Sequence, residues 1–111
     1  MLSVTDHLLA CLEEEAGEIA QVVGKGLRFG LDDANPKTNA LNRDLLKAEV
    51  HDVIAIWQLL CAQEGWDPTT DPELIRRKLL RAIKYINYAK ERGRILPLET
   101  LPVEQDHELS K

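Results

Sequence analysis

The chain has 111 residues, 44% of them hydrophobic and 30% charged, with a formal net charge of −5. This length predicts one domain with a small core, and the acidic balance argues against nucleic acid as a partner. No apolar run approaches the length of a membrane span, and no basic-then-apolar signal pattern opens the chain, so we expect a cytoplasmic protein without a membrane partner. Cys11 and Cys61 fall in apolar helical stretches, which is typical of reduced core residues.

The first predicted element is a helix that Ser3 or Thr5 caps and that runs to about Val23. Its apolar residues recur at helical spacing and form a stripe, which consists of Val4, Leu8, Leu12, Ile19 and Val22. Glu15 falls in the middle of this stripe, and Glu18 shares its face because it follows three residues later. Residues 1–24 contain five acids and no Lys or Arg, so this part of the chain is suited to cations.

A long connection follows, from Gly24 to Asn42. It is rich in glycine and in Asp and Asn turn formers, and loops of this length are commonly functional or mobile. Lys25 and Arg28 place positive charge just beyond the acidic helix. Two interpretations stay open. The segment is either a lid that orders over a bound phosphate compound or a connector packed on the helices by Leu27, Phe29 and Leu31.

The second predicted helix has its cap at Thr38 or Asn42 and ends just before Gly65. Its apolar stripe consists of Leu45, Val53, Ile56 and Leu60. Glu49 falls inside this stripe, and Asp52 lies near its edge on the same helical face. Each of the first two helices therefore carries a pair of acids where apolar residues are expected.

The third predicted helix begins with Asp71 as cap and Pro72 at its first position, and it runs to about Arg92 before Gly93. Residues 72–94 contain eight Lys and Arg against two Glu, so this segment can meet anions. We predict a helical domain over residues 1–94 and a Pro-containing acidic C-terminal tail over residues 95–111.

The two acidic pairs carry the functional hypothesis. Acids from two packed helices would converge, and unpaired carboxylates in such a place are costly and raise each other's pKa. Neither stripe contains a lysine that could neutralise them. Hard oxygen ligands of this kind suit Mg²⁺, with Mn²⁺ as the other candidate, so the spacing predicts metal-dependent phosphate chemistry. The alternative is that the acids lie on the wet margins of their helices.

The stretch Glu14-Glu-Ala-Gly-Glu18, followed by Glu49-Val-His-Asp52, resembles the E-E-x-x-E … E-x-x-D signature of the MazG-like all-α nucleoside triphosphate pyrophosphohydrolases. This resemblance implies a Mg²⁺-dependent hydrolase that cleaves a nucleoside or deoxynucleoside triphosphate to the monophosphate and pyrophosphate, in the house-cleaning of the nucleotide pool. It also implies a homodimer or homotetramer. Glu15, Glu18, Glu49 and Asp52 match the family's metal ligands. Glu14 would act with Glu15 in catalysis, as a group that orients the attacking water, unless it is a solvated surface acid.

Other residues are candidates for binding the substrate. Lys84 and Asn87 resemble the Lys and Asn that the family places on its third helix, and Lys78 or Arg81 could hold that role instead. Lys25 and Arg28 of the connection are candidates for contacts with phosphate oxygens. For each residue of the basic helix the alternative is a solvated charged face. His51 lies between two of the acids in the sequence and is expected at the surface or in an interface.

The expected fold is all-α, a bundle of three main helices with a four-helix-bundle-like core that oligomerisation completes. Two other functions compete with the hydrolase. A di-iron carboxylate bundle needs Glu-x-x-His motifs, and the position three after Glu49 is Asp52, so this function is disfavoured. A non-catalytic helical binding module that uses the basic third helix remains the alternative.

Overall fold

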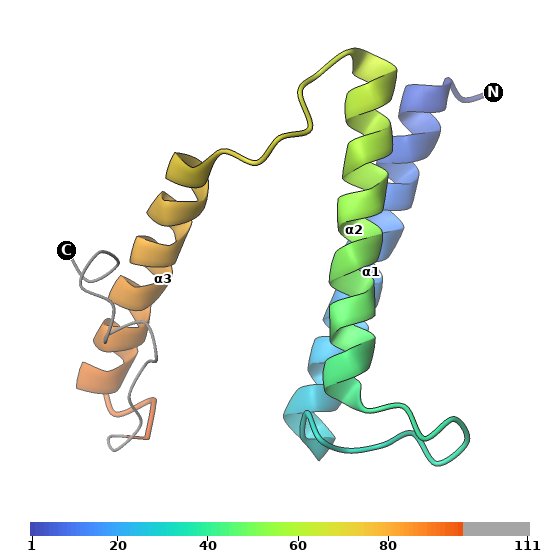
Figure 1. Cartoon of the computed structure of the whole chain (residues 1–111). Coiled ribbons are helices and arrows are strands. Elements are labelled where there is room, and N and C mark those ends of the chain that lie inside the picture. Colours follow the sequence, from blue (N-terminus) through green and yellow to red (C-terminus); the bar gives the residue numbers. More distant parts are fainter. Residues whose placement is uncertain (97–111) are drawn as a thin grey trace. The chain divides into compact units, whose positions relative to one another are not determined.

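The structure, a computed structural model, describes residues 1–96 (Figure 1). Within them lie three helices: α1 (Val4–Phe29), α2 (Asn42–Glu64) and α3 (Pro72–Glu91). No strand occurs among these residues, apart from an isolated bridge between Ala34 and Leu41, so the predicted all-α fold is confirmed. No helix in the described part is both long and apolar enough to cross a membrane. The predicted tail lies almost wholly outside the described residues.

The chain divides into two compact units, Met1–Pro68 and Thr69–Lys111. The first holds α1 and α2 with their connecting loop, and the second holds α3. Each unit is described here by itself. The predicted domain boundary after residue 94 stays a prediction.

Helix α1 begins as expected and ends later than expected. The Ser3 side chain accepts a hydrogen bond from the Asp6 backbone N–H at 3.0 Å, which caps the first turn. The helix continues six residues past Val23, to Phe29, so the predicted end was wrong. Glycine in a helix costs about 1 kcal/mol relative to alanine. Here the Leu31 side chain packs back onto the helix at Gly26, where an added Cβ would lie 3.0 Å from it.

Helix α2 takes its cap from the loop. Leu41 occupies the cap position without a side-chain hydrogen bond. The backbone N–H groups of Asn42 and Arg43 instead donate to the carbonyl oxygens of Asp33 and Leu31, at 3.0 and 2.9 Å. Asn42, a predicted cap, is the first helical residue, and its side chain donates a hydrogen bond to the Gly30 carbonyl oxygen. Gly65 ends the helix in a left-handed conformation with φ 75°, as expected.

Helix α3 follows its sequence signals closely. The Asp71 carboxylate accepts a hydrogen bond from the Glu73 N–H at 2.9 Å, and Pro72 stands at the first position. The helix ends at Glu91, one residue before the predicted end, and Gly93 follows with φ 69°. No residue of α3 is buried.

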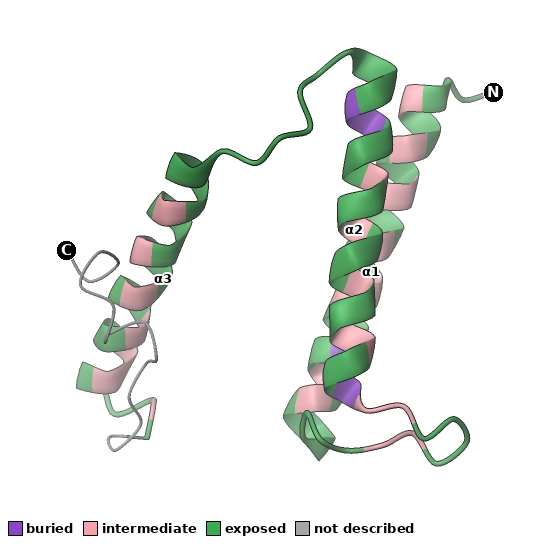
Figure 2. Ribbon diagram, viewed as in Figure 1, coloured by how far each residue is buried: buried purple, intermediate pink, exposed green. Residues whose placement is uncertain are grey.

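Helices α1 and α2 run antiparallel, side by side (Figure 1). Their buried residues fall at two separate places along the pair (Figure 2). Leu60 and Cys61 are buried near one end, and Val22 and Asn42 near the loop end. Most other residues of the two predicted stripes are half-buried, although Val4 is exposed. Cys61 is therefore a core residue as predicted, Cys11 is half-buried, and both thiols are free.

Candidate metal centre

The four predicted acids converge between α1 and α2. Glu15 and Glu18 come from α1, and Glu49 and Asp52 from α2. Each offers one carboxylate oxygen, and these four oxygens all lie within 4.8 Å of one another. The i, i+3 spacing on each helix and the antiparallel packing of the helices together produce this cluster. We call it the acidic centre.

Burial within the acidic centre is uneven. The side chains of Glu15, Glu18 and Glu49 are half-buried, and Asp52 is exposed. One oxygen of Glu15 and one of Glu49 (Oε2 in both) are shielded from water and have no hydrogen-bond partner. A shielded polar atom without a partner costs about 1–3 kcal/mol, and more where it is charged. These two atoms therefore favour a proton or a cation in the centre.

The ionisation of the centre reflects this crowding. Burial, together with the neighbours Glu18, Glu15 and Asp52, raises the pKa of Glu49 to about 7. Burial and the charge of Glu18 also raise the pKa of Glu15, while a hydrogen bond with Glu49 opposes the rise. A proton on Glu49 can be donated to Glu15, whereas two ionised carboxylates have no donor between them. The metal-free centre thus holds a proton near neutral pH.

The donor set fits a divalent cation of the Mg²⁺ or Mn²⁺ type. All four groups are carboxylates, which are the hard oxygen ligands that such ions prefer. The two orphaned oxygens of Glu15 and Glu49 supply the structural reason, because a cation would satisfy both without a hydrogen-bond donor. The centre is exposed at Asp52 and shielded at Glu15 and Glu49, so one side of it is open to solvent.

Glu14 and His51 lie next to the clustered acids in the sequence, but only Glu14 has an electrostatic effect on one of them. Glu14 is exposed and is not one of the four clustered acids, but its charge contributes to the raised pKa of Glu15. His51 is exposed as expected, and its Nδ1 lies 2.7 Å from the Lys47 carbonyl oxygen. Because a carbonyl oxygen only accepts, Nδ1 donates there. Glu14 can act on the centre through its charge, whereas His51 is engaged with its own helix.

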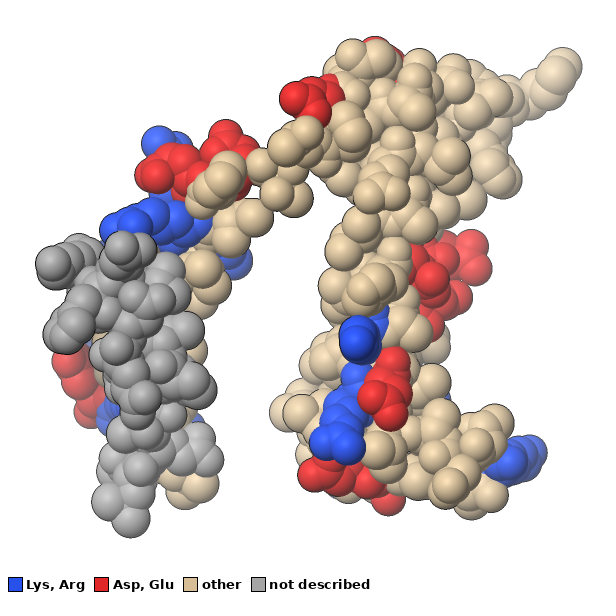
Figure 3. Space-filling model, viewed as in Figure 1, with Lys and Arg blue, Asp and Glu red and all other residues tan. Residues whose placement is uncertain are grey.

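Lys25 and Arg28 lie on the last turns of α1, and both line a cavity of about 200 Å³ that we call the loop cavity. Its other lining residues include Phe29, Asp33, Asn35 and Leu45. The Arg28 guanidinium carbon is 5.2 Å from the centre of the Phe29 ring, and its Nε donates to the Gly24 carbonyl oxygen at 3.3 Å. At this end of the α1–α2 pair, basic and acidic side chains lie close together (Figure 3).

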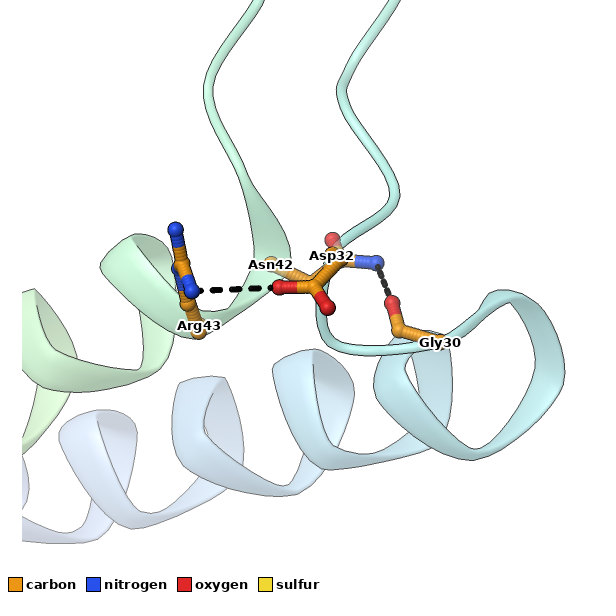
Figure 4. A network of polar contacts seen from close by, with 4 residues as sticks. All are labelled: Gly30, Asp32, Asn42 and Arg43. Atoms are coloured by element: carbon orange, nitrogen blue, oxygen red, sulfur yellow. Dashed lines mark hydrogen bonds and ion pairs between the residues drawn. The ribbon is translucent and has the colours of Figure 1, made fainter.

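The loop around this cavity is held by polar contacts at its two ends (Figure 4). The Asn42 side chain is 5% exposed and donates from Nδ2 to the Gly30 carbonyl oxygen at 3.0 Å. Arg43 and Asp32 form an ion pair at 3.2 Å. Farther out, the Asn35 N–H donates to the Ala40 carbonyl oxygen at 2.9 Å. These polar contacts hold the segment as a connector, but Leu27, Phe29 and Leu31, which were expected to pack it on the helices, are 83%, 63% and 51% exposed, so that part of the prediction was wrong. Closure on a ligand stays a prediction.

The substrate-binding candidates of the basic helix belong to the second unit. Arg81 and Lys84 line an open hollow of about 430 Å³ together with Arg77 and Leu80. Their spacing places all of these residues along one face of α3. Lys78 and Asn87 are exposed on the same helix and do not line that hollow.

Sequence reasoning found the acids and missed part of the loop cavity. Asp33, Asn35 and Asn42 read as turn formers, because Asp and Asn are common in turns for backbone reasons alone. The available signal was Asn42 at the start of an apolar stripe, where a polar side chain needs a partner.

No protein-family model, curated protein or solved structure matches this chain.

Proposed function

We propose that the protein is a Mg²⁺-dependent nucleoside triphosphate pyrophosphohydrolase, which cleaves a nucleoside or deoxynucleoside triphosphate to the monophosphate and pyrophosphate. The observation that carries the proposal is the acidic centre, in which four carboxylates meet and two shielded oxygens have no partner. The order of the acids along the chain, with the E-E-x-x-E half on α1 and the E-x-x-D half on α2, supports the same reaction class by resemblance.

The chemistry follows from the properties of the residues. A bound divalent cation would supply positive charge to the phosphate oxygens and lower the pKa of a water that it coordinates. Glu15, Glu18, Glu49 and Asp52 would hold the cation through their oxygens. The exposed Glu14 would orient the attacking water through its carboxylate.

Phosphate oxygens of the substrate also need partners from the protein. Lys25 and Arg28, at the end of α1, add positive charge that attracts the triphosphate toward the centre. On α3, Arg81 and Lys84 line one hollow, and these two residues, with Lys78 and Asn87, are candidates for phosphate binding by the resemblance alone. As an enzyme of the nucleotide pool, the protein would act in the cytoplasm.

The chain is proposed to act as a homodimer or homotetramer. Among the described residues, only Val22, Leu60 and Cys61 form the buried apolar core. Helix α2 leaves Ile54 and Trp57 45% and 41% exposed on a face at helical spacing. A pair of helices covers one side of each helix, and a second pair would complete a four-helix bundle. Light scattering at micromolar concentration should give a multiple of 12.6 kDa, and a monomer would contradict this part of the proposal.

Pyrophosphate release from a panel of triphosphates tests the reaction directly. With Mg²⁺ present, the wild-type chain should turn over at least one triphosphate, and chelation of the cation should stop it. Glu49→Gln keeps the shape of the side chain and removes a ligand, so turnover should fall by at least about 100-fold, since even residues that only support metal ligands cost 10–100-fold. Glu13→Gln on α1 makes the same charge change at an exposed site and should retain activity. Normal turnover in Glu49→Gln would refute the assignment.

A non-catalytic binding module remains the second candidate, and the hollow on α3 is the observation in its favour. Arg77, Arg81 and Lys84 present three positive charges there. This function predicts binding of a polyanion such as single-stranded RNA with a steep salt dependence and no pyrophosphate release.

A further inference from the structure

We propose that the loop cavity binds the base of the nucleotide and that Asp33 makes it prefer a base with amino and imino donors, guanine above all. The inference rests on the proposed function, because it takes the ligand to be a nucleotide. The acidic centre would bind only the phosphates and does not select a base. The inference adds where the base binds and names Asp33 as the residue that selects it.

The lining of the loop cavity is mixed in a way that suits a base better than a phosphate group. Lys25 and Arg28 offer donors, Asp33 offers a carboxylate that accepts, and Phe29 and Leu45 offer apolar surface. A phosphate placed here would meet the Asp33 carboxylate, and like charges at short range repel each other. A neutral heterocycle presents donors and acceptors on its edge and has an apolar face. It can therefore hydrogen-bond to the basic side chains and to the Asp33 carboxylate, and it can pack on the apolar side chains.

The position of the cavity relative to the acidic centre fits a single nucleotide. Lys25 follows Glu18 by seven residues, which is about 10 Å along α1 and returns to the same helical face. Leu45 precedes Glu49 by four residues, about 6 Å along α2 and again on the same face. The cavity therefore continues the side of the α1–α2 pair that carries the acids. A ribose and its 5′ ester link would span this interval between a base in the cavity and phosphates at the centre.

The size of the cavity points to the base alone. Pockets that enclose drug-sized ligands usually have about 300–1,000 Å³. At about 200 Å³ the loop cavity accepts one ring system, and the rest of a nucleotide must lie outside it. The walls are already in place, because hydrogen bonds of Asn42 and Asn35 hold the loop in its fold. A site that is formed in advance loses less entropy when its ligand binds.

The choice among bases follows from the groups that face the ligand. Guanine presents an amino and an imino donor side by side, which a carboxylate such as Asp33 can accept as a pair. It also presents the O6 and N7 acceptors that Arg and Lys commonly contact. Uracil presents one imino donor between two carbonyl oxygens, so the Asp33 carboxylate would face an acceptor as well as a donor. A polar group left unpaired in the site disfavours the wrong base.

Calorimetric titration of nucleoside monophosphates in the presence of a chelator tests the cavity without the metal or the reaction. Wild-type protein should bind GMP at least about fivefold more tightly than UMP, the lower end of the discrimination that one good pair of hydrogen bonds gives. Asp33→Asn replaces one of the two acceptor oxygens with an NH2 donor, so the pair of guanine donors loses one acceptor and the ratio should come close to one. Asp44→Asn makes the same change at an exposed site on α2 outside the cavity and should keep the preference.

The outcomes separate this inference from the proposed function. Glu49→Gln should keep the preference for GMP while it loses pyrophosphate release, since the base does not touch the acidic centre. A GMP preference in a protein that releases no pyrophosphate from any triphosphate would leave the cavity assignment standing and refute the reaction. Equal binding of GMP, UMP and inorganic phosphate, a preference that survives Asp33→Asn, or no binding of GMP at millimolar concentration would each overturn the cavity assignment.

Discussion

Binding of Mg²⁺ to this protein should depend on pH with a midpoint near neutrality and should release protons. The reason lies in the acidic centre, where burial and the neighbours Glu18, Glu15 and Asp52 raise the pKa of Glu49 to about 7. A cation binds the ionised carboxylates, so the proton on Glu49 must leave when the metal enters. The pKa of Glu15 is raised as well, and its proton would act in the same direction.

The size of the effect follows from that pKa. A group with a pKa of about 7 is protonated in about nine molecules of ten at pH 6, in half at pH 7 and in about one of ten at pH 8. The apparent affinity for Mg²⁺ should therefore be about tenfold weaker at pH 6 than at pH 8 through Glu49 alone. At pH 7 each bound cation should release about half a proton, and at pH 8 nearly none.

Isothermal titration calorimetry in two buffers of different ionisation enthalpy measures both quantities at each pH. The charge-matched variant Glu13→Gln should behave like the wild type, because Glu13 is exposed and is not among the clustered acids. His51→Gln, which removes the nearest histidine in the sequence and none of the clustered acids, should also leave the pH dependence unchanged. Equal affinity at pH 6 and pH 8 without proton release would show that Glu49 is ionised and hydrated, and the reasoning from burial would fail.

Three further predictions concern stability. Because the folded state binds the Glu49 proton more tightly than the unfolded state, the metal-free protein should lose stability as the pH rises from about 4.5 to about 7, and a thermal melt should show a higher Tm near pH 5 than near pH 8. Asn42→Ala removes one of the two donors to the Gly30 carbonyl, the other being the Asp33 N–H, and should cost about 0.5–1.5 kcal/mol in urea unfolding, whereas the exposed Lys37→Ala should change little. Gly24→Ala should stabilise the protein by about 0.5–1 kcal/mol in the same assay, because an added Cβ meets nothing within 4 Å; a loss of stability would contradict the helical assignment there.

The parts of the fold that were predictable are those that neighbouring residues decide. The caps at Ser3 and Asp71 and the stop at Gly65 are set within a few positions of the chain, and each is found where the sequence indicates. The acidic centre was predictable for a related reason. An i, i+3 pair fixes a helical face, so two such pairs in apolar stripes point toward the same interface when the stripes pack, although their register along the helices is not fixed by the pattern.

The parts that were not predictable depend on contacts between distant segments. The end of α1 was placed at Val23 because Gly24 and Gly26 weaken a helix locally, but the residues just after the helix are held by α2, whose Arg43 N–H donates to the Leu31 carbonyl oxygen. The loop cavity depends on the Asn42 side chain reaching the Gly30 carbonyl across twelve positions. Such a long-range hydrogen bond is hard to predict for an Asn or Asp, because these residue types also occur in ordinary turns, where they bond only to the nearby backbone.

The register between α1 and α2 links the packing of the pair to its chemistry. A hydrogen bond from the Thr5 hydroxyl to the Glu64 carboxylate ties the pair at one end, and the Asn42–Gly30 hydrogen bond ties it at the other. Buried residues lie toward both ends, with the acids between them, so apolar contacts on each side hold the two acidic pairs opposite each other. A slip of one helix by a turn would move an acid by about 5.4 Å, more than the 4.8 Å within which the four oxygens now meet. The small core therefore does more than stabilise the pair, because it also sets the geometry that a cation would need.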